Sequence, residues 1–190
     1  MIELQNVSFS YGDLQVLKGF NLIVQDGECV CLKSPSGGGK TTVFRLVAGL
    51  EKPQSGQVLA PQKLAVVFQE DRLLTYMTLK SNVILPLKKS QYKKAVELLK
   101  EVGLGSFLNI PISKLSGGMK RRAAIIRAIA FEGEALLLDE PFNGIDLENK
   151  RVLAEIIKRE VLSKNIPVLI STHIREDAEL LSAKTSELSF

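Results

Sequence analysis

Residues 34–42 form a glycine-rich segment, Ser34-Pro35-Ser36-Gly37-Gly38-Gly39-Lys40-Thr41-Thr42. The apolar run 28–33 before it predicts a buried strand, and the pattern of 39–50 after it predicts a helix. Such a loop binds phosphate, because N–H groups at a helix N-terminus carry partial positive charge and glycines admit an anion to the backbone. We therefore expect residues 36–42 to hold ATP, with Lys40 on the β- and γ-phosphates and the Thr41 hydroxyl on Mg²⁺.

Ser34 departs from the strict pattern of such loops, G-x-x-x-x-G-K-[ST], which has glycine at that position. A residue with a Cβ disfavours positive φ, so we expect an altered turn or a lower affinity for ATP. The competing interpretation is a flexible glycine-rich turn beside an unrelated lysine. The order of strand, three glycines, Lys-Thr and helix favours the phosphate loop.

Apolar runs and amphipathic segments alternate along the rest of the chain. The first third is rich in β-forming residues. Short apolar runs predict three further strands, at 63–68, 135–138 and 166–171. Amphipathic periodicity predicts helices at 117–131, 147–164 and 175–182. Strands that alternate with helices predict an α/β core with a mainly parallel sheet.

The segment 70–114 differs in character from its surroundings. It has few β-rich runs and shows helical spacing of apolar residues. We expect one domain over residues 1–190, in which 1–69 and 115–190 form the core and 70–114 form an inserted helical subdomain.

The composition is that of an ordinary globular protein. Of the 190 residues, 45% are hydrophobic and 24% are charged, which excludes wholesale disorder. The net charge of +4 is dispersed and does not predict a nucleic-acid partner. Cys29 and Cys31 are too close in sequence for an unstrained disulfide, so we expect buried strand residues, with metal chelation as the weaker alternative. The sequence predicts neither a signal peptide nor a membrane span, and hence a cytosolic location.

Two adjacent carboxylates and the single histidine are the candidate catalytic groups. Asp139 and Glu140 end the apolar run 135–138, and ligands of α/β folds bind where strands end. We expect Asp139 to hold the metal and Glu140 to orient or deprotonate the attacking water. His173 also follows an apolar run, where it would donate to the γ-phosphate or position water. A solvated acidic turn and a structural histidine are the alternatives.

Six short motifs together resemble those of the ABC-type ATPases. Besides the phosphate loop, they are Leu115-Ser116-Gly117-Gly118-Met119 (signature), Ala135–Pro141 (Walker B), Gln69 (Q-loop), Asn143-Gly144-Ile145-Asp146 (D-loop) and His173 (switch histidine). Each motif alone is weak, but their shared order over residues 2–181 is specific. The resemblance implies a P-loop NTPase core with a mainly parallel sheet, an N-terminal antiparallel β subdomain and the inserted helical subdomain.

The resemblance also implies how two subunits share their sites. Two copies meet head to tail around two ATP molecules, so that Ser116, Gly117 and Gly118 of one chain clamp the ATP held by the other. It implies further that Tyr11 stacks on adenine and that Asp146 lies at the nucleotide.

Within the same resemblance, Gln69 is expected to contact Mg²⁺ and the attacking water, and to couple the site to the helical subdomain. Glu140 is expected to act as the base, with His173 beside it. ATP then holds the dimer together, and hydrolysis releases it.

The leading interpretation is the ATPase subunit of a transporter. We expect a second, simplest identical, ATPase subunit, transmembrane permease subunits, a solute-binding protein where the system imports, and a place on the cytoplasmic face of the membrane. The permease surface is predicted within 71–87, where Leu73, Leu74, Tyr76 and Met77 recur. Ordinary subdomain core is the alternative for these four side chains.

Several positions refine the resemblance. Met119 stands where glutamine is commonest, and with the stretch 69–74 it is similar to importer subunits for nitrate, sulfonate or taurine. Asn143 and Ile174 also depart from the commonest residues. A soluble ABC ATPase of DNA repair or translation is the second interpretation, but no sustained heptads separate Gln69 from Ser116, and each motif occurs once. A non-catalytic scaffold or a kinase is the third, disfavoured by Glu140 and the signature.

Overall fold

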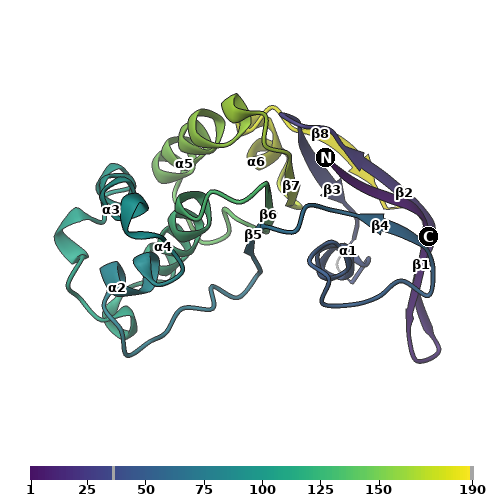
Figure 1. Ribbon diagram of the computed structural model, residues 1–190, viewed down its shortest axis with the longest axis horizontal. Helices are drawn as coiled ribbons and strands as arrows, with labels where there is room; N and C mark the ends of the chain where they lie inside the picture. The colour runs from purple at the N-terminus through teal and green to yellow at the C-terminus, as the bar shows by residue number, and fades with distance from the viewer. Residues whose placement is uncertain (36, 189–190) are drawn as a thin grey trace.

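The computed structural model describes residues 1–35 and 37–188. A parallel sheet with the strand order β5-β6-β7-β3-β8 forms its centre (Figure 1). The strands are β3 (Cys29–Lys33), β5 (Leu64–Val67), β6 (Ala135–Asp139), β7 (Val168–Ser171) and β8 (Lys184–Glu187). Because β6, β7 and β3 are neighbours, the residues that follow them gather at one edge of the sheet, where ligands of α/β folds bind.

A second, antiparallel sheet covers one face of the molecule. Its order is β2-β1-β4, and its strands are β1 (Ile2–Tyr11), β2 (Leu14–Val24) and β4 (Ser55–Leu59). Helix α1 (Lys40–Val47) packs in the apolar core between the two sheets, where Phe44 joins Leu4 of β1 and Leu137 of β6. The start of α1 is therefore fixed from both sides.

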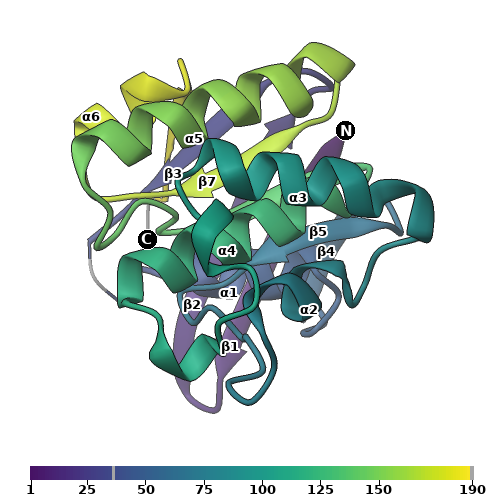
Figure 2. The ribbon, with the colours of Figure 1, turned by 90° about the vertical axis from the view of Figure 1, so that its left-hand side faces the viewer.

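The remaining helices lie on the other side of the parallel sheet from α1. They are α2 (Leu79–Ile84), α3 (Tyr92–Glu101), α4 (Gly117–Ala130), α5 (Leu147–Glu160) and α6 (Arg175–Leu180). Short 3₁₀ turns lie at Lys89–Gln91, Gly105–Phe107, Ile112–Lys114 and Leu162–Lys164. Figure 2 shows α2 and α3 in front of α4, and both helices pack against it.

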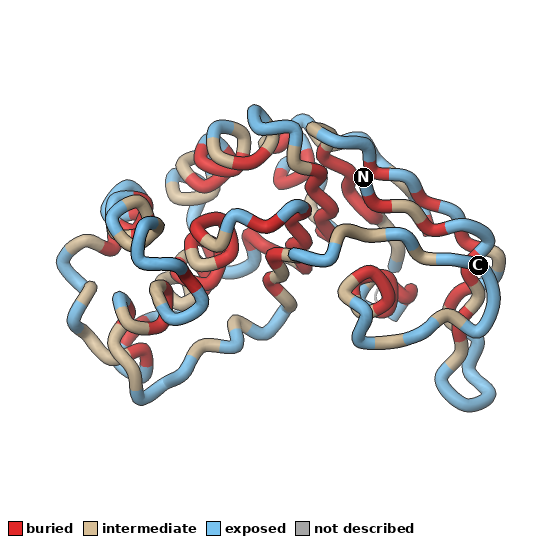
Figure 3. Tube along the Cα trace, in the orientation of Figure 1, coloured by how far each residue is buried: buried red, intermediate tan, exposed pale blue. Residues whose placement is uncertain are grey.

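Side chains of the central strands alternate between two apolar cores. Cys29 and Cys31 face the core under α4 and α5, whereas Val30 and Leu32 face the core around α1. Figure 3 shows the buried residues concentrated along these strands and the inward sides of the helices. Both cysteines are free and buried, as predicted, and burial raises the pKa of the Cys29 thiol to about 12. The Cys29 thiol is thus protonated and inert near neutral pH.

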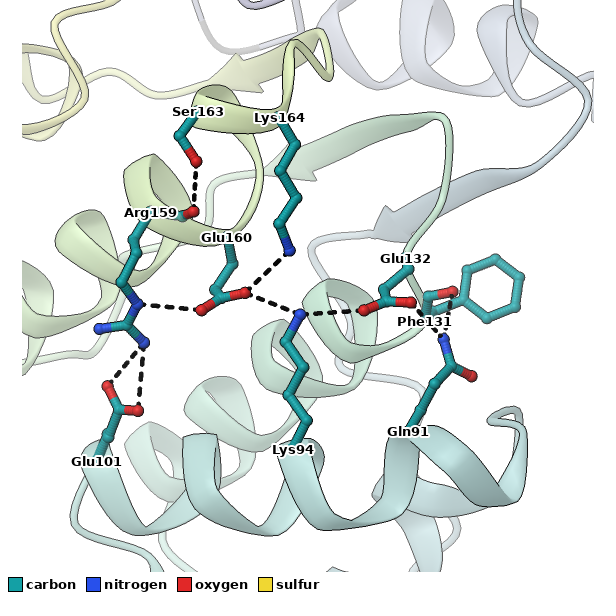
Figure 4. Close-up of polar contacts among 9 residues, drawn as sticks. All are labelled: Gln91, Lys94, Glu101, Phe131, Glu132, Arg159, Glu160, Ser163 and Lys164. Atoms are coloured by element: carbon teal, nitrogen blue, oxygen red, sulfur yellow. Dashed lines mark hydrogen bonds and ion pairs between the residues drawn. The ribbon is translucent and has the colours of Figure 1, made fainter.

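An ion-pair network joins α3 to the core (Figure 4). The Lys94 ammonium lies 3.0 Å from a carboxylate oxygen of Glu132 and 2.8 Å from one of Glu160. Lys164 and Arg159 also donate to Glu160, and Arg159 reaches Glu101 on α3. Burial raises the pKa of Glu160, but these hydrogen bonds outweigh it and lower the pKa to about 2.

The predicted α/β class, the mainly parallel sheet and the antiparallel β-sheet near the N-terminus are confirmed. Two strands were not predicted, β4 and β8, and the helix predicted for 147–164 ends at Glu160 before a 3₁₀ turn. In the segment 71–87, Leu73 packs on the core, whereas Tyr76 is 79% exposed. No helix in the described part of the chain has the length and apolarity that crossing a bilayer requires.

Candidate nucleotide site

The phosphate loop is closed by bonds of Lys40 and Ser34. The Lys40 ammonium donates to the carbonyl oxygens of Ser34 at 2.8 Å and Pro35 at 3.2 Å, and the Ser34 hydroxyl donates to the Gly38 carbonyl at 2.9 Å. Because α1 begins at Lys40, the N–H groups of its first turn have no intrahelical acceptors and can bind an anion. Ser36, which we expected at the phosphate, lies outside the described residues.

Two glycines of the loop are required by their surroundings. Gly39 has φ +75°, and a Cβ there would lie 2.9 Å from Cγ1 of Val16. A Cβ on Gly38 would lie 2.4 Å from the Ser34 hydroxyl oxygen. The loop therefore excludes side chains at both positions. Ser34 itself is absent from the non-glycine residues that have positive φ in the described chain, so the backbone strain expected there does not arise.

Thr41 and Asp139 bring two oxygen ligands together. The Thr41 hydroxyl donates to Oδ2 of Asp139 at 2.9 Å, and the Ser171 hydroxyl donates to Oδ1 of the same carboxylate. A hydroxyl beside one carboxylate suits Mg²⁺, which prefers few protein ligands and completes its shell with water and phosphate oxygens. Residues 1–35 and 37–188 hold no cluster of three or more His, Cys, Asp or Glu that would suit a metal bound by protein alone.

Glu140 is held in a strained backbone conformation beside His173. Its φ is +51°, a left-handed conformation that costs a non-glycine residue free energy and persists only where the surrounding structure holds it. The Glu140 N–H donates to the Ser171 hydroxyl at 3.0 Å, which fixes the turn after β6. Oε2 of Glu140 lies 3.1 Å from Nδ1 of His173. The glutamate side chain is 15% exposed and the histidine 63%, so His173 covers Glu140 from the solvent side.

A cavity of about 320 Å³ lies over the phosphate loop. It is lined by Tyr11, Leu14, Val16, Gly37–Thr42, Gln69, Asp139 and Glu140. Tyr11 is 39% exposed and packs edge-on against Phe9, with ring centroids 4.8 Å apart. The cavity thus brings together Tyr11, the loop, Gln69 and both carboxylates.

The signature and D-loop residues lie elsewhere. Ser116 caps the N-terminus of α4 and accepts from the Met119 N–H at 3.3 Å. Asp146 caps α5, and hydrogen bonds from Asn149 lower its pKa. Among the described residues that line the cavity, Ser116, Gly117, Gly118 and Asp146 are absent. A Cβ on Gly118 would lie 2.9 Å from the Gly144 carbonyl oxygen, so signature and D-loop are packed together.

The sequence analysis assigned no role to two polar residues at this site. Ser171 lies opposite Asp139 in the register of β6 and β7, which explains how its hydroxyl bridges Asp139 and Glu140. A serine at the end of an apolar run was the available signal. Arg121 is only 5% exposed and contacts the Asp139–Pro141 backbone, a role that its place directly after the signature motif concealed.

Comparison with known proteins identifies the family. The family model described as ABC transporter matches residues 17–143. An aliphatic sulfonates import ATP-binding protein of Shouchella clausii is 36% identical over 95% of this chain and 74% of its own length. A spermidine/putrescine import ATP-binding protein of Mesoplasma florum is also 36% identical, over 96% of this chain and 57% of its own length.

Solved structures agree with the sequence relatives. A structure of an ATP-binding subunit of an ABC transporter has a TM-score of 0.91 and 26% identity over 99% of this chain and 85% of that one. A dimeric post-hydrolysis state of the ATP-binding cassette MJ0796, bound to ADP and Pi, has a TM-score of 0.86 and 26% identity over 100% of this chain and 94% of that one. The chain therefore belongs to the ABC transporter family, as an ATP-binding and ATP-hydrolysing subunit.

Proposed function

We propose that two copies of this chain bind two ATP molecules head to tail and hydrolyse them to drive solute import. One observation carries the proposal: the phosphate loop and carboxylates share a cavity, whereas the exposed N-terminus of α4 lies outside it. Ser116, Gly117 and Gly118 then have donors to offer but no phosphate within their own chain, so a second copy completes each site. The dimeric cassettes among the similar structures support this arrangement.

The phosphate loop supplies most of the proposed ATP contacts. The backbone of 37–42 cradles the phosphates, and Lys40 moves its ammonium onto the β- and γ-phosphate oxygens. Tyr11 packs on adenine, because it is the exposed aromatic at the cavity rim. Asp146 fixes the loop 143–146 beside the signature, from where it faces the partner's nucleotide.

Thr41, Asp139 and Gln69 form the proposed Mg²⁺ site. Mg²⁺ would neutralise charge that develops on the β- and γ-phosphate oxygens. Thr41 would offer its hydroxyl to the ion, Asp139, which accepts from that hydroxyl, would supply the negative charge, and Gln69 lines the same cavity. The Ser171 hydroxyl keeps the Asp139 carboxylate oriented.

Glu140 is the proposed general base. Its carboxylate takes the proton of the water that attacks the γ-phosphate, and His173 holds that carboxylate from the other side. Gln69 orients the same water. A base held at a strained backbone position keeps its place because the Ser171 and Arg121 bonds to its main chain define it.

The proposed membrane partners follow from the relatives. The relatives are named as import ATP-binding proteins. One is named for anionic sulfonates and another for cationic polyamines, and both are 36% identical to this chain. The ATPase chain therefore does not select the solute. We place it on the cytoplasmic face of the membrane, against separate permease subunits that the exposed Tyr76 and Leu74 contact, with a solute-binding protein outside.

Light scattering and phosphate release test the proposal together. With ATP and Mg²⁺, the wild type is expected to release phosphate, and Glu140→Gln to lose about 100-fold or more of the turnover and to become a stable dimer. Glu155→Gln on the exposed side of α5 is the matched control and should behave as wild type. A Glu140→Gln protein that binds ATP but stays monomeric would refute the shared site.

A further inference from the structure

Arg121 holds the loop that carries the catalytic carboxylates. It lies in the second turn of α4 and is 5% exposed. Its Nε donates to the Pro141 carbonyl at 3.1 Å, and its Nη2 donates to the Glu140 carbonyl at 2.9 Å and to the Asp139 carbonyl. One guanidinium thus binds three consecutive carbonyl oxygens around Glu140.

The other arm of the same guanidinium holds the Q-loop. Nη1 donates to the Phe68 carbonyl at 2.6 Å, to the Gln69 carbonyl at 3.3 Å and to the Asp71 carboxylate at 3.1 Å. Asp71 also neutralises the buried charge. All three nitrogens of Arg121 are therefore engaged, and they join two loops that are far apart in the chain.

Only arginine has the geometry for these contacts. Its planar guanidinium presents five N–H donors in a fixed fork, whereas lysine presents three donors from a single point. A lysine could neutralise Asp71 but could not reach both loops at once. β5 and β6, which precede Gln69 and Glu140, are paired strands, and Arg121 adds side-chain bonds that join the two loops beyond the ends of these strands.

That side chain belongs to the helix whose N-terminus is Ser116. The distance from Ser116 to Arg121 is little more than one turn of α4, so both residues move with the same rigid element. A partner's phosphate at Ser116 would hold α4, and α4 would hold this chain's Gln69 and Glu140 through Arg121.

We propose that Arg121 is a positioning residue that fixes Gln69 and Glu140 relative to each other and ties both to the signature helix. The inference rests on the proposed roles of Ser116 and Glu140. Arg121 itself does not line the cavity among the described residues, so it acts on the reaction through the two loops and not through ATP.

Arg121→Met is the direct test, because methionine fills much of the space and donates no hydrogen bond. We expect kcat for ATP hydrolysis to fall about 30- to 100-fold, while KM for ATP changes less than about 3-fold, since the phosphate loop is untouched. An unchanged kcat, or a loss confined to KM, would overturn the proposal.

Arg127→Met is the matched control. Arg127 lies further along α4 and donates to the carbonyls of Asp71 and Arg72, but it makes no bond to 139–141. Thermal unfolding of the two variants separates general destabilisation from positioning. Arg127→Met should keep kcat within about 3-fold of wild type. A loss of kcat equal to that of Arg121→Met would show that any disturbance of α4 lowers kcat, and it would overturn the positioning role.

Arg121→Lys keeps the charge that neutralises Asp71 and is the second variant, which tests the positioning role if the methionine variant does not fold. We expect it to recover less than about one fifth of the wild-type kcat, because charge without the fork cannot join the loops. Recovery of the full wild-type kcat would overturn the proposal, because it would show that a positive charge at this position is enough.

A double variant separates this proposal from the proposed function. Arg121→Met combined with Glu140→Gln should still dimerise with ATP and Mg²⁺, because within the described residues the Arg121 side chain makes no bond to the phosphate loop or to the signature residues that are proposed to hold ATP. If Glu140→Gln alone dimerises and the double variant does not, Arg121 merely places α4 and the positioning role fails. If Glu140→Gln alone stays monomeric, the shared site itself fails.

Discussion

The Thr41 hydroxyl donates to Oδ2 of Asp139 at 2.9 Å, although 98 positions separate the two residues. Thr41 lies in the first turn of α1 and Asp139 ends β6. Since α1 packs against β6, the end of the strand and the start of the helix meet at one edge of the sheet. This contact places the two proposed metal ligands beside the phosphate loop.

Asp139→Asn should abolish the response of ATP hydrolysis to Mg²⁺. The amide keeps the size of the side chain but loses the charge that attracts the cation, so we expect kcat to fall about 100-fold or more. A Mg²⁺ titration of phosphate release checks this. Asp26→Asn, an exposed carboxylate far from the loop, is the control; equal Mg²⁺ curves for the two variants would contradict the metal role.

His173→Ala should lower kcat about 10- to 100-fold and leave KM for ATP nearly unchanged. The imidazole lies 3.1 Å from Oε2 of Glu140, so its loss frees the base without touching the phosphate loop. Steady-state kinetics measure the two constants. His173→Gln keeps a donor and should recover part of kcat. A variant that changes only KM would show that His173 acts on nucleotide binding and not on Glu140.

The strands that could be predicted from the sequence are the buried ones. The strands β3, β6 and β7 are buried along their length and read as short apolar runs, so their positions and the residues that follow them were predicted. β4 and β8 were missed because they are mostly exposed edge strands of polar sequence, such as Lys184–Glu187. Their pairing comes from neighbouring strands and leaves no periodic signal.

Polar contacts between residues far apart in the chain could not be predicted from the sequence either. The spacing of motifs gave Asp139, Glu140 and His173 as candidates, but the Ser171 bridge depends on the register of β6 against β7. The role of Arg121 depends on α4 passing behind two loops at once. Such contacts are set by tertiary geometry, and residue type alone does not reveal them.

Gly39→Ala should weaken ATP binding and destabilise the protein by about 1–3 kcal/mol, because alanine at φ +75° is strained and its Cβ meets Val16. Equilibrium unfolding and nucleotide titration measure both effects. Gly49→Ala is matched in φ, at +68°, but has open space and lies outside the cavity. It should cost less stability and leave ATP affinity unchanged; equal losses of affinity would rule out a local effect on the loop.

Acid should weaken the attachment of α3 through Glu160. The folded-state pKa of this carboxyl is about 2, below its ordinary value of 4.5, because hydrogen bonds from Lys94, Arg159 and Lys164 outweigh the effect of burial. The stabilisation is fully present above pH 4.5 and is lost as the pH falls toward 2, on the order of 2–3 kcal/mol in total.

Lys94→Met should therefore destabilise the protein at pH 7 and reduce the further loss of stability between pH 4.5 and 2. Urea unfolding at pH 7, 4 and 3 measures this. Lys93→Met, an exposed neighbour on α3, should retain the wild-type pH profile, and an identical profile for Lys94→Met would show that the network adds no stability.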